Sequence, residues 1–483
     1  MITADFLHKL KGVVGADGLV TDQSELLTYE SDGLMARRSR PAAAVLPETA
    51  DQVQAVVRLC AQHAVPFVAR GQGTGLSGGA LPHPEGVLIV MTRMNRVLLI
   101  DIPNQRITVE PGLTNLEVTR QVAADGYYYA PDPSSQVICS IGGNLAENSG
   151  GAHCLKYGFT VHHVLGVEAV LPDGEMVHLG GEAVDSPGLD LLGVIVGSEG
   201  TLAVITKVVL RLSRRPQAVR TLLAAFDSTD AAANAVSDVI SAGIIPAAIE
   251  MMDRTTLRAC EAAVHPGFPD AEAALIVELD GPQSEVDTLF QQIEAVCARN
   301  QAWGVQVAAD DAQRGRIWRG RKAAFAAMGR VSPNYYVQDG VIPRTTLPDV
   351  LRRVRALEQR SGLTIGNVFH AGDGNLHPLV CYDDAVEGQA ELAEKVAAEI
   401  LSYCLDVGGS LTGEHGIGSD KVCHMPKMFS DDDLATMKLV RVAFDPDGIC
   451  NPDKLFPTPR LCGEVPGPYR AHPAETAGLA ARV

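Results

Sequence analysis

The sequence contains few aromatic residues and no closely paired cysteines. Aromatic side chains make up 5% of its 483 residues, and the ten cysteines form no CxxC motif. A disulfide framework, a zinc ribbon and an iron–sulfur cluster are therefore poorly supported, and free thiols in a reducing compartment fit better. No apolar run approaches the ~18 residues of a membrane span. The first residues also lack the apolar region of a secretory signal, so we expect a cytoplasmic protein.

Basic charge is scarce as well. The 58 acidic side chains outnumber the 40 basic ones, which gives a formal net charge of −18. Because a phosphate polymer or an anionic membrane would repel such a chain, we expect no nucleic-acid partner. An anionic small molecule can still bind where local cations or a metal overcome the general field.

The length predicts more than one domain, since 483 residues exceed one ordinary core. Residues 1–37 predict a helical arm, and 38–216 predict a first domain of strand, helix, strand and further short β-rich runs. Strands alternate with helices after Pro216, which is typical of an α+β domain with an antiparallel sheet. We assign this domain to 217–412, a C-terminal segment to 413–456, and a mobile tail rich in Pro, Gly and Ala to 457–483.

A glycine-rich loop follows a predicted strand at Arg70–Gly79. Its string RGQGTGLSGG contains GxGxxG, but the residues after it, ALPHP, cannot continue the helix that a dinucleotide site needs. The NAD interpretation therefore fails. Either the loop is a turn without a ligand, or its open backbone amides form a phosphate nest. A second stretch of small residues at 131–151, PDPSSQVICSIGGNLAENSGG, favours the nest, because two such segments suit a long diphosphate ligand.

Several strings resemble the FAD motifs of the vanillyl-alcohol oxidase/p-cresol methylhydroxylase flavoprotein superfamily. They are RGQGTGLSGG, YYAPDPSSQ, SIGGNLAENSGG, LKYG and GSEGTLAVIT, and the resemblance runs from about residue 37 to 456. It implies an α+β fold with a two-subdomain FAD-binding domain and an α+β substrate (cap) domain containing an antiparallel sheet. It also implies FAD as cofactor. The FAD is expected to be non-covalent, because no histidine lies between Arg70 and Leu81 to tether it.

The same resemblance assigns cofactor contacts to three parts of the chain. The loop around the diphosphate comprises Arg70, Gly71, Gly73, Thr74, Gly75 and Ser77. The residues expected beside the flavin or its ribityl chain are Pro131, Ser134, Gly142, Gly143, Asn144, Asn148, Gly150 and Tyr157. Those expected near the adenine half are Glu199, Gly200 and Ile205.

The string HAGDGNLH at 370–377 predicts a hairpin, because Asp-Gly is a strong two-residue turn signal. Such a turn would pair His370 with His377 on one face, with Cβ atoms ~5 Å apart. Two imidazoles so placed can chelate a divalent ion, with Glu414 as a third ligand and His415 beside it. Two histidines and one carboxylate leave open positions, which is typical of a catalytic metal site. The alternative is a histidine pair that only packs and hydrogen-bonds at a sheet edge.

HAGDGNLH and GEHG resemble the metal signature of the D-2-hydroxyacid dehydrogenase branch of this superfamily. The resemblance implies that His370, His377 and Glu414 bind a divalent metal, often zinc, and that His415 is the catalytic base. Arg321 matches the arginine that binds the substrate carboxylate in this branch. Arg319 is an equal candidate for a carboxylate partner or for a solvent-facing charge.

Two positions indicate the size of the substrate. Some relatives have a lysine near 337 and an asparagine near 379, where this chain has Val337 and Leu379. This difference argues against a second carboxylate and favours a small monocarboxylate, glycolate or D-lactate. In the expected chemistry the metal binds the 2-hydroxyl and one carboxylate oxygen. His415, with a pKa near neutrality, then removes the hydroxyl proton, and hydride passes from C2 to flavin N5.

The chain has no cysteine cluster to carry electrons away. The resemblance therefore implies a second flavin-domain subunit and an iron–sulfur subunit that deliver electrons to membrane quinone, which would place the protein at the inner face of the membrane. Two alternatives remain at this point. One is a stand-alone D-lactate dehydrogenase, and the other is a metal-dependent hydrolase in which Glu414 or His415 activates water. A non-catalytic assembly subunit is disfavoured, because the metal and base residues are present.

Overall fold

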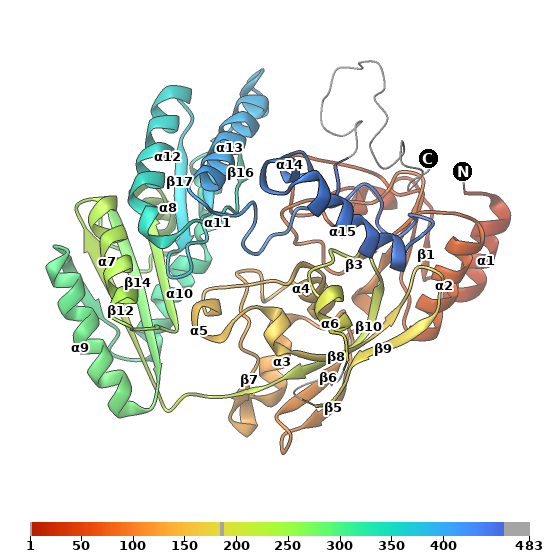
Figure 1. Ribbon diagram of the computed structural model, residues 1–483, viewed down its shortest axis with the longest axis horizontal. Helices are drawn as coiled ribbons and strands as arrows, with labels where there is room; N and C mark the ends of the chain where they lie inside the picture. The colour runs from red at the N-terminus through yellow and green to blue at the C-terminus, as the bar shows by residue number, and fades with distance from the viewer. Residues whose placement is uncertain (1, 184–187, 458–483) are drawn as a thin grey trace.

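The computed structural model describes residues 2–183 and 188–457. The tail predicted at 457–483 lies, apart from residue 457, outside the described residues. The chain forms two halves, with the first sheets at the right of Figure 1 and a larger sheet at the left. The last helices cross back from the left half to the right half.

The first sheet has four strands in the order β1-β2-β4-β3. The strands β2, β4 and β3 run parallel, and β1 pairs antiparallel with β2. The bounds are β1 Leu19–Val20, β2 Ala43–Val45, β3 Phe67–Arg70 and β4 Val87–Val90. Helix α2 (Ala50–Gln62) begins where the Thr49 side chain accepts a hydrogen bond from the backbone of Gln52, as N-cap residues do. This order confirms the strand, helix and strand predicted between Pro41 and Arg70.

The segment 1–37 differs from the predicted helical arm. Helix α1 (Ala4–Val14) is followed by strand β1, which joins the first sheet. The helix buries Phe6, Leu10 and Val14 in the same apolar cluster as α2. The segment therefore packs as part of the first half, because its apolar side chains are covered there.

The second sheet is antiparallel and carries one side of the cavity described below. Its strand order is β5-β6-β10-β8-β9, and short helix α4 (Ile141–Glu147) contacts β10. The bounds are β5 Val97–Asp101, β6 Arg106–Val109, β8 Val164–Val170, β9 Met176–Gly180 and β10 Val204–Arg211. A separate two-stranded antiparallel sheet pairs β7 (Tyr127–Tyr128) with β11 (Ser213–Arg214).

The left half is built on a seven-stranded antiparallel sheet in the order β15-β12-β14-β13-β17-β18-β16. Its strands are β12 Ala218–Phe226, β13 Ala248–Asp253, β14 Ala273–Gly281, β15 Trp303–Val307, β16 Asn334–Val337, β17 Ile365–His370 and β18 Pro378–Tyr382. Successive side chains of β12 enter two different apolar clusters. Because side chains alternate across a strand, both faces of this sheet are buried, which explains why its strands read as continuous apolar runs.

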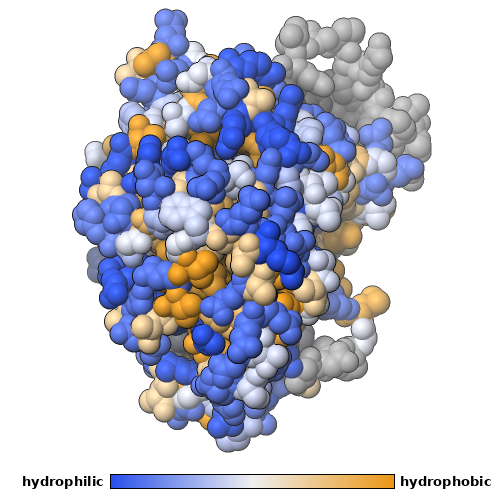
Figure 2. All heavy atoms as spheres, turned by 90° about the vertical axis from the view of Figure 1, so that its left-hand side faces the viewer, coloured by the Kyte–Doolittle hydropathy of each residue, from blue (hydrophilic) through white to orange (hydrophobic). Residues whose placement is uncertain are grey.

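Different helices cover the two faces of this sheet. One face packs against α7 Thr229–Ser241, α9 Gln283–Arg299, α12 Leu347–Ser361 and α13 Gln389–Asp406. The other face packs against α8 Arg254–Val264, α10 Asp311–Lys322 and α11 Ala324–Ala327. Figure 2 shows the outer side of this half, where hydrophilic side chains predominate around a smaller group of apolar residues near the middle.

The C-terminal segment returns to the first sheet. After α14 (Met425–Met428) and α15 (Asp431–Phe444), residue Cys450 forms a parallel bridge with Phe67 at the edge of β3. The side-chain amide of Asn451 donates to the carbonyls of Gly79 and Glu199. The end of the described chain therefore holds the glycine loop in place.

Candidate active site

A cavity of about 380 Å³ lies between the two halves. One wall is the glycine loop at 70–76 with the segment 139–149, and residues from the α10–α11 region form the opposite wall. Glu414 and His415 also belong to the lining. The cavity therefore brings the glycine-rich segments and the Glu-His pair, predicted from separate parts of the sequence, to one site.

Most of the residues predicted to contact FAD line this cavity. They are Arg70, Gly71, Gly73, Thr74, Gly75, Ser134, Gly142, Gly143, Asn144, Glu199, Gly200 and Ile205. Ser77, Pro131, Asn148, Gly150 and Tyr157 lie outside the lining. The Tyr157 hydroxyl donates instead to Asp280 at 2.6 Å, and the Ser77 hydroxyl donates to the carbonyl of His415 at 2.8 Å.

Two glycines of the loop face different surroundings. Gly73 has φ +68°, and a Cβ there would lie 2.1 Å from the Arg70 guanidinium, which donates to the carbonyls of Tyr29 and Ser31. A Cβ on Gly75 would meet nothing closer than Glu147, at 3.9 Å. Gly75 therefore presents open backbone to the cavity, as a site for a bound diphosphate requires, and Gly73 makes room for the anchoring arginine.

Glu147 is a cavity residue that the sequence reasoning missed. It lies beside Glu199, which accepts hydrogen bonds from the backbone of Ile417 at 2.7 Å and Gly418 at 2.6 Å. Burial raises the pKa of Glu199 to about 7. Burial and the neighbouring Glu199 raise the pKa of Glu147 well above its usual range. This pair can therefore keep a proton near neutral pH and offer a hydrogen-bond donor to a ligand.

The predicted register of the histidine hairpin is wrong. His370 pairs with Asn375, and the backbone of Val368 donates to the carbonyl of His377. Gly374 has a positive φ but Asp373 does not, so the two-residue turn does not form. The turn is longer and comprises residues 371–374, between the paired His370 and Asn375. Within it, Gly374 packs against the carbonyl of Ile342, where a Cβ would lie 2.2 Å away. The His370 and His377 rings nevertheless lie 5.1 Å apart between centroids.

The three predicted metal ligands come together. Nε2 of His370 lies 3.2 Å and Nε2 of His377 lies 3.3 Å from Oε1 of Glu414. Nδ1 of His377 is buried without a hydrogen-bond partner, and Nε2 makes only ion-pair contacts, with Glu414 and with Asp339. Buried polar atoms normally have partners, and two imidazoles with a carboxylate are common ligands of zinc. The arrangement therefore fits a divalent metal.

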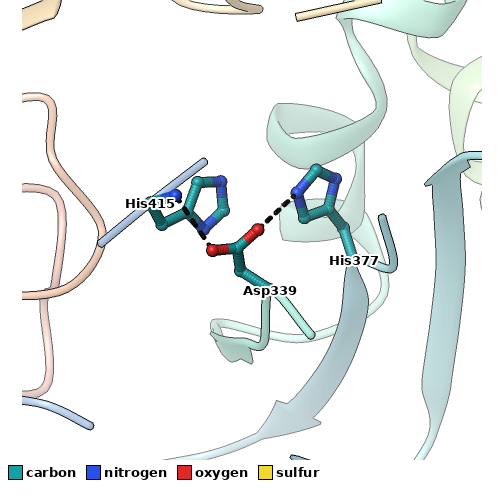
Figure 3. A group of neighbouring side chains, drawn as sticks. All are labelled: Asp339, His377 and His415. Atoms are coloured by element: carbon teal, nitrogen blue, oxygen red, sulfur yellow. Dashed lines mark hydrogen bonds and ion pairs between the residues drawn. The ribbon is translucent and has the colours of Figure 1, made fainter. Parts of the chain in front are cut away.

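Asp339 is a second residue that the sequence reasoning missed (Figure 3). It is fully buried between His377 and His415, and the three could hold a metal as a group. Its carboxylate already accepts hydrogen bonds from the backbone of His415 at 2.9 Å, the side chain of Asn375 at 2.7 Å and the hydroxyl of Thr412 at 2.5 Å. Asp339 therefore holds the loop that carries Glu414.

His415 has the properties of a neutral base. Its ring stacks on that of His377, with centroids 4.8 Å apart and planes 8° apart. Burial lowers the pKa of His415 to about 4, below the near-neutral value expected from the sequence. An imidazole with this pKa is unprotonated at neutral pH and can accept a proton from a bound ligand.

Arg321, predicted to bind the substrate carboxylate, is paired with a buried acidic residue in this structure, and its role toward the substrate stays a prediction. Its side chain is buried and lies outside the cavity lining. Nε lies 2.6 Å and Nη2 lies 2.5 Å from Oε2 of Glu250. Arg319 is exposed to solvent. The neighbouring Lys322 lines the cavity instead, because adjacent residues on a helix point in different directions.

Comparison with known families matches most of the chain to flavoenzyme domains. Residues 41–180 match a model described as "FAD binding domain", and residues 215–455 match "FAD linked oxidases, C-terminal domain". The structure superposes on p-cresol methylhydroxylase with a TM-score of 0.79 and 16% identity, covering 93% of this chain and 96% of that one. This likeness confirms the predicted fold class.

Relatives in sequence agree with the family models. Glycolate oxidase subunit GlcD of Escherichia coli K12 is 49% identical over 94% of this chain and 91% of the relative. GlcD of Bacillus subtilis is 37% identical over 94% of this chain and 97% of the relative. A D-lactate dehydrogenase of Anaerostipes hadrus is 30% identical over 94% of this chain and 98% of the relative.

The chain is thus an FAD-dependent oxidoreductase. It belongs to the FAD-linked oxidase family that contains the GlcD subunits and these D-lactate dehydrogenases. This membership excludes the metal-dependent hydrolase considered from the sequence. Across 2–183 and 188–457, no helix is long and apolar enough to cross a membrane.

Proposed function

We propose that the protein oxidises a small 2-hydroxy acid, glycolate in the first place, to the 2-oxo acid. The observation that carries this proposal is the cavity whose lining contains both the glycine loop at 70–76 and the pair Glu414 and His415. A cofactor on the loop and a substrate beside His415 would then share one cavity. The names of the GlcD relatives support glycolate, and D-lactate remains the near alternative because it adds only one methyl group.

The chain's own residues divide the work of binding and proton transfer. His415 is unprotonated and accepts the substrate hydroxyl proton at an imidazole nitrogen. Asp339 and Ser77 hold the backbone of His415 from both sides, through its N–H and its carbonyl. The FAD of this family supplies the hydride acceptor when it is bound. A divalent metal held by His370, His377 and Glu414, a ligand set typical of zinc, would lower the pKa of the substrate hydroxyl.

Anaerobic reduction of the bound flavin tests the proposal. The purified yellow protein is mixed with glycolate, D-lactate, L-lactate and D-2-hydroxyglutarate, and the loss of oxidised flavin absorbance is followed in a stopped-flow instrument. We expect fast reduction by glycolate, slower or equal reduction by D-lactate, and little by the five-carbon dicarboxylate. A flavin-loaded protein that none of these acids reduces would contradict the proposal.

We propose further that the electrons leave through partner subunits. Neither candidate metal group in the described part of the chain contains a cysteine, and the GlcD relatives are named as subunits. The expected partners are a second flavin-domain subunit and an iron–sulfur subunit, with membrane quinone as the final acceptor and a cytoplasmic position at the inner face of the membrane. Co-purification with a tagged chain tests this assembly. Rapid quinone reduction by the isolated chain would contradict it.

A further inference from the structure

We propose that Glu147 binds FAD as a neutral carboxyl group, so that binding of the cofactor is coupled to the uptake of one proton. The inference goes beyond the proposed function, because it concerns how the cofactor is held and not which acid is oxidised. The FAD motifs assign no cofactor contact to Glu147, although it lies within the string SIGGNLAENSGG.

The carboxyl group of Glu147 lies beside the glycine loop. Glu147 is the last residue of α4 and lines the cavity. Its Oε1 is 2.7 Å from the position that a Cβ on Gly79 would take, and 3.9 Å from the corresponding position on Gly75. The missing side chain at Gly79 therefore leaves the room that this carboxyl group occupies, next to the part of the loop expected to hold the diphosphate.

Glu147 and Glu199 converge on the same glycine of the second half. A Cβ on Gly416 would lie 2.5 Å from Oε2 of Glu147 and 2.7 Å from Oε1 of Glu199. Two backbone N–H groups, of Ile417 and Gly418, donate to Glu199 and stabilise its charged form. Oε2 of Glu147 is buried without a hydrogen-bond partner. Of these two carboxyl groups, Glu147 is therefore the one that keeps a proton.

The other charged groups that act on Glu147 are mostly acidic. Asp32, from the segment before β2, and Asp339, which follows β16, oppose its ionisation together with Glu199. Lys421 favours the charged form, but its ammonium group already lies 3.2 Å from the carboxylate of Asp339. Burial and the neighbouring carboxylates therefore hold the pKa of Glu147 well above its usual range.

The glycine loop offers no cation that would balance an ionised Glu147. Within residues 70–79, all of which the structure describes, Arg70 is the one basic side chain, and it donates to the carbonyls of Tyr29 and Ser31. His415, on the same cavity, is unprotonated at neutral pH. A carboxylate would repel the negative charges of a diphosphate held by backbone amides, whereas a neutral carboxyl group donates a hydrogen bond. Glu147 is therefore protonated when FAD is bound.

This coupling makes the affinity for FAD depend on pH. The diphosphate raises the pKa of Glu147 further in the complex, because it adds negative charge beside the carboxyl group. FAD binds with full affinity while Glu147 is protonated in the free protein. As the pH rises through the pKa of Glu147 in the FAD-free protein, binding must bring a proton, and the Kd then rises by up to about tenfold per pH unit.

The test measures the release of FAD from the diluted holoenzyme by flavin fluorescence between pH 6 and pH 9. We expect the Kd of the wild type to rise at least about tenfold over this range. Glu147→Gln, whose amide is neutral and donates a hydrogen bond at every pH, should keep a nearly constant Kd. At pH 9 this variant should therefore bind FAD more tightly than the wild type, a gain that damage to the fold would not produce. Glu175→Gln, at an exposed position between β8 and β9, is the matched control and should follow the wild type.

Glu147→Ala tests the hydrogen bond separately from the charge. This variant is also neutral at position 147 but has no donor there, so its Kd should be nearly constant and about 10–100-fold above that of Glu147→Gln, the usual worth of a hydrogen bond to a charged group. A constant Kd in the wild type, an equal rise of Kd in Glu147→Gln, or equal affinities of Glu147→Gln and Glu147→Ala would each overturn the inference. A wild-type protein that holds FAD but is reduced by no 2-hydroxy acid would instead overturn the proposed function.

Discussion

Oε1 of Glu250 lies 2.8 Å from Nδ1 of His370. This contact fixes which nitrogen of the imidazole is free, so Nε2 turns toward Glu414. The other oxygen of Glu250 pairs with the buried Arg321. Glu250 is fully buried, and a buried charge requires such a partner. Glu250 therefore links Arg321 to His370.

Replacing this carboxylate should loosen the metal site. We expect Glu250→Gln to lower metal affinity by about 10–100-fold, the usual effect of losing a carboxylate behind a metal-binding histidine. Metal affinity is measured by competition with a coloured chelator, and flavin content is measured in parallel. Glu285→Gln, at an exposed position of α9, serves as the control. Equal metal affinity in the variant and the wild type would show that Glu250 does not orient His370.

A side chain at Gly75 should exclude the cofactor without disturbing the fold. The Cβ would point into open space. Without flavin, the free energy of unfolding of Gly75→Val should therefore lie within about 1 kcal/mol of that of the flavin-free wild type, as for most substitutions away from the core. The valine would occupy space that the diphosphate needs. We therefore expect flavin affinity to fall at least about tenfold, which corresponds to a loss of ~1.4 kcal/mol of binding free energy. Flavin absorbance of the purified variant measures this loss. Full flavin content would contradict the placement of the diphosphate.

Gly73→Val is the contrasting variant. Its positive φ and the nearby Arg70 make any side chain at 73 strained. We expect this variant to lose thermal stability as well as flavin, which circular dichroism on heating would detect. Comparison of Gly73→Val with Gly75→Val therefore distinguishes two causes of flavin loss, distortion of the loop and obstruction of the cavity.

Local patterns predicted much of the fold. The strand, helix and strand predicted between Pro41 and Arg70 form as β2, α2 and β3. The register of the hairpin could not be predicted from the local sequence at 370–377. It depends on the packing of Gly374 against Ile342, which comes from another part of the chain.

The site was predicted only where motifs carry it. His370, His377 and Glu414 stand in conspicuous strings and come together as expected. Asp339 and Glu250 are single acidic residues in ordinary strings, and they reach the site through strand pairing and loop contacts. The contact of Arg321 with Glu250 depends on how α10 is rotated, because a step of one residue turns the side chain by about 100°. No local pattern contains that rotation.

Removal of the His415 imidazole should slow the chemistry while both binding sites persist. Because Glu414 and not His415 completes the group with His370 and His377, His415→Ala should keep metal and flavin. Flavin reduction by glycolate should slow by roughly 10²–10⁴-fold, the usual contribution of a general base. Anaerobic stopped-flow measures the rate, and added imidazole should restore part of it. His178→Ala, an exposed position, is the control, and a near wild-type rate in His415→Ala would place the base elsewhere.

A charged histidine joins the two halves of the protein. His153, from the first half, contacts Asp132 at 3.0 Å and Glu278 of β14 at 3.2 Å. Burial alone would lower its pKa, but the two carboxylates outweigh this effect and raise the pKa to about 10. The ordinary value for histidine is about 6.5. Proton binding by His153 therefore stabilises the folded state.

The pH dependence of stability follows from this shift. Because the folded pKa lies above the unfolded value, the stabilisation is fully present below pH ~6.5 and is lost as the pH rises toward ~10. Between pH 7 and pH 10 we expect the free energy of unfolding of the wild type to fall by about 2–4 kcal/mol more than that of His153→Gln. A pKa shift is worth ~1.4 kcal/mol per unit, and partial solvent screening reduces this figure. Thermal unfolding of both proteins across this range measures the difference. His178→Gln, whose side chain is 72% exposed, should follow the wild type. If the curves of His153→Gln and the wild type fall in parallel, His153 does not carry a proton at the junction of the two halves.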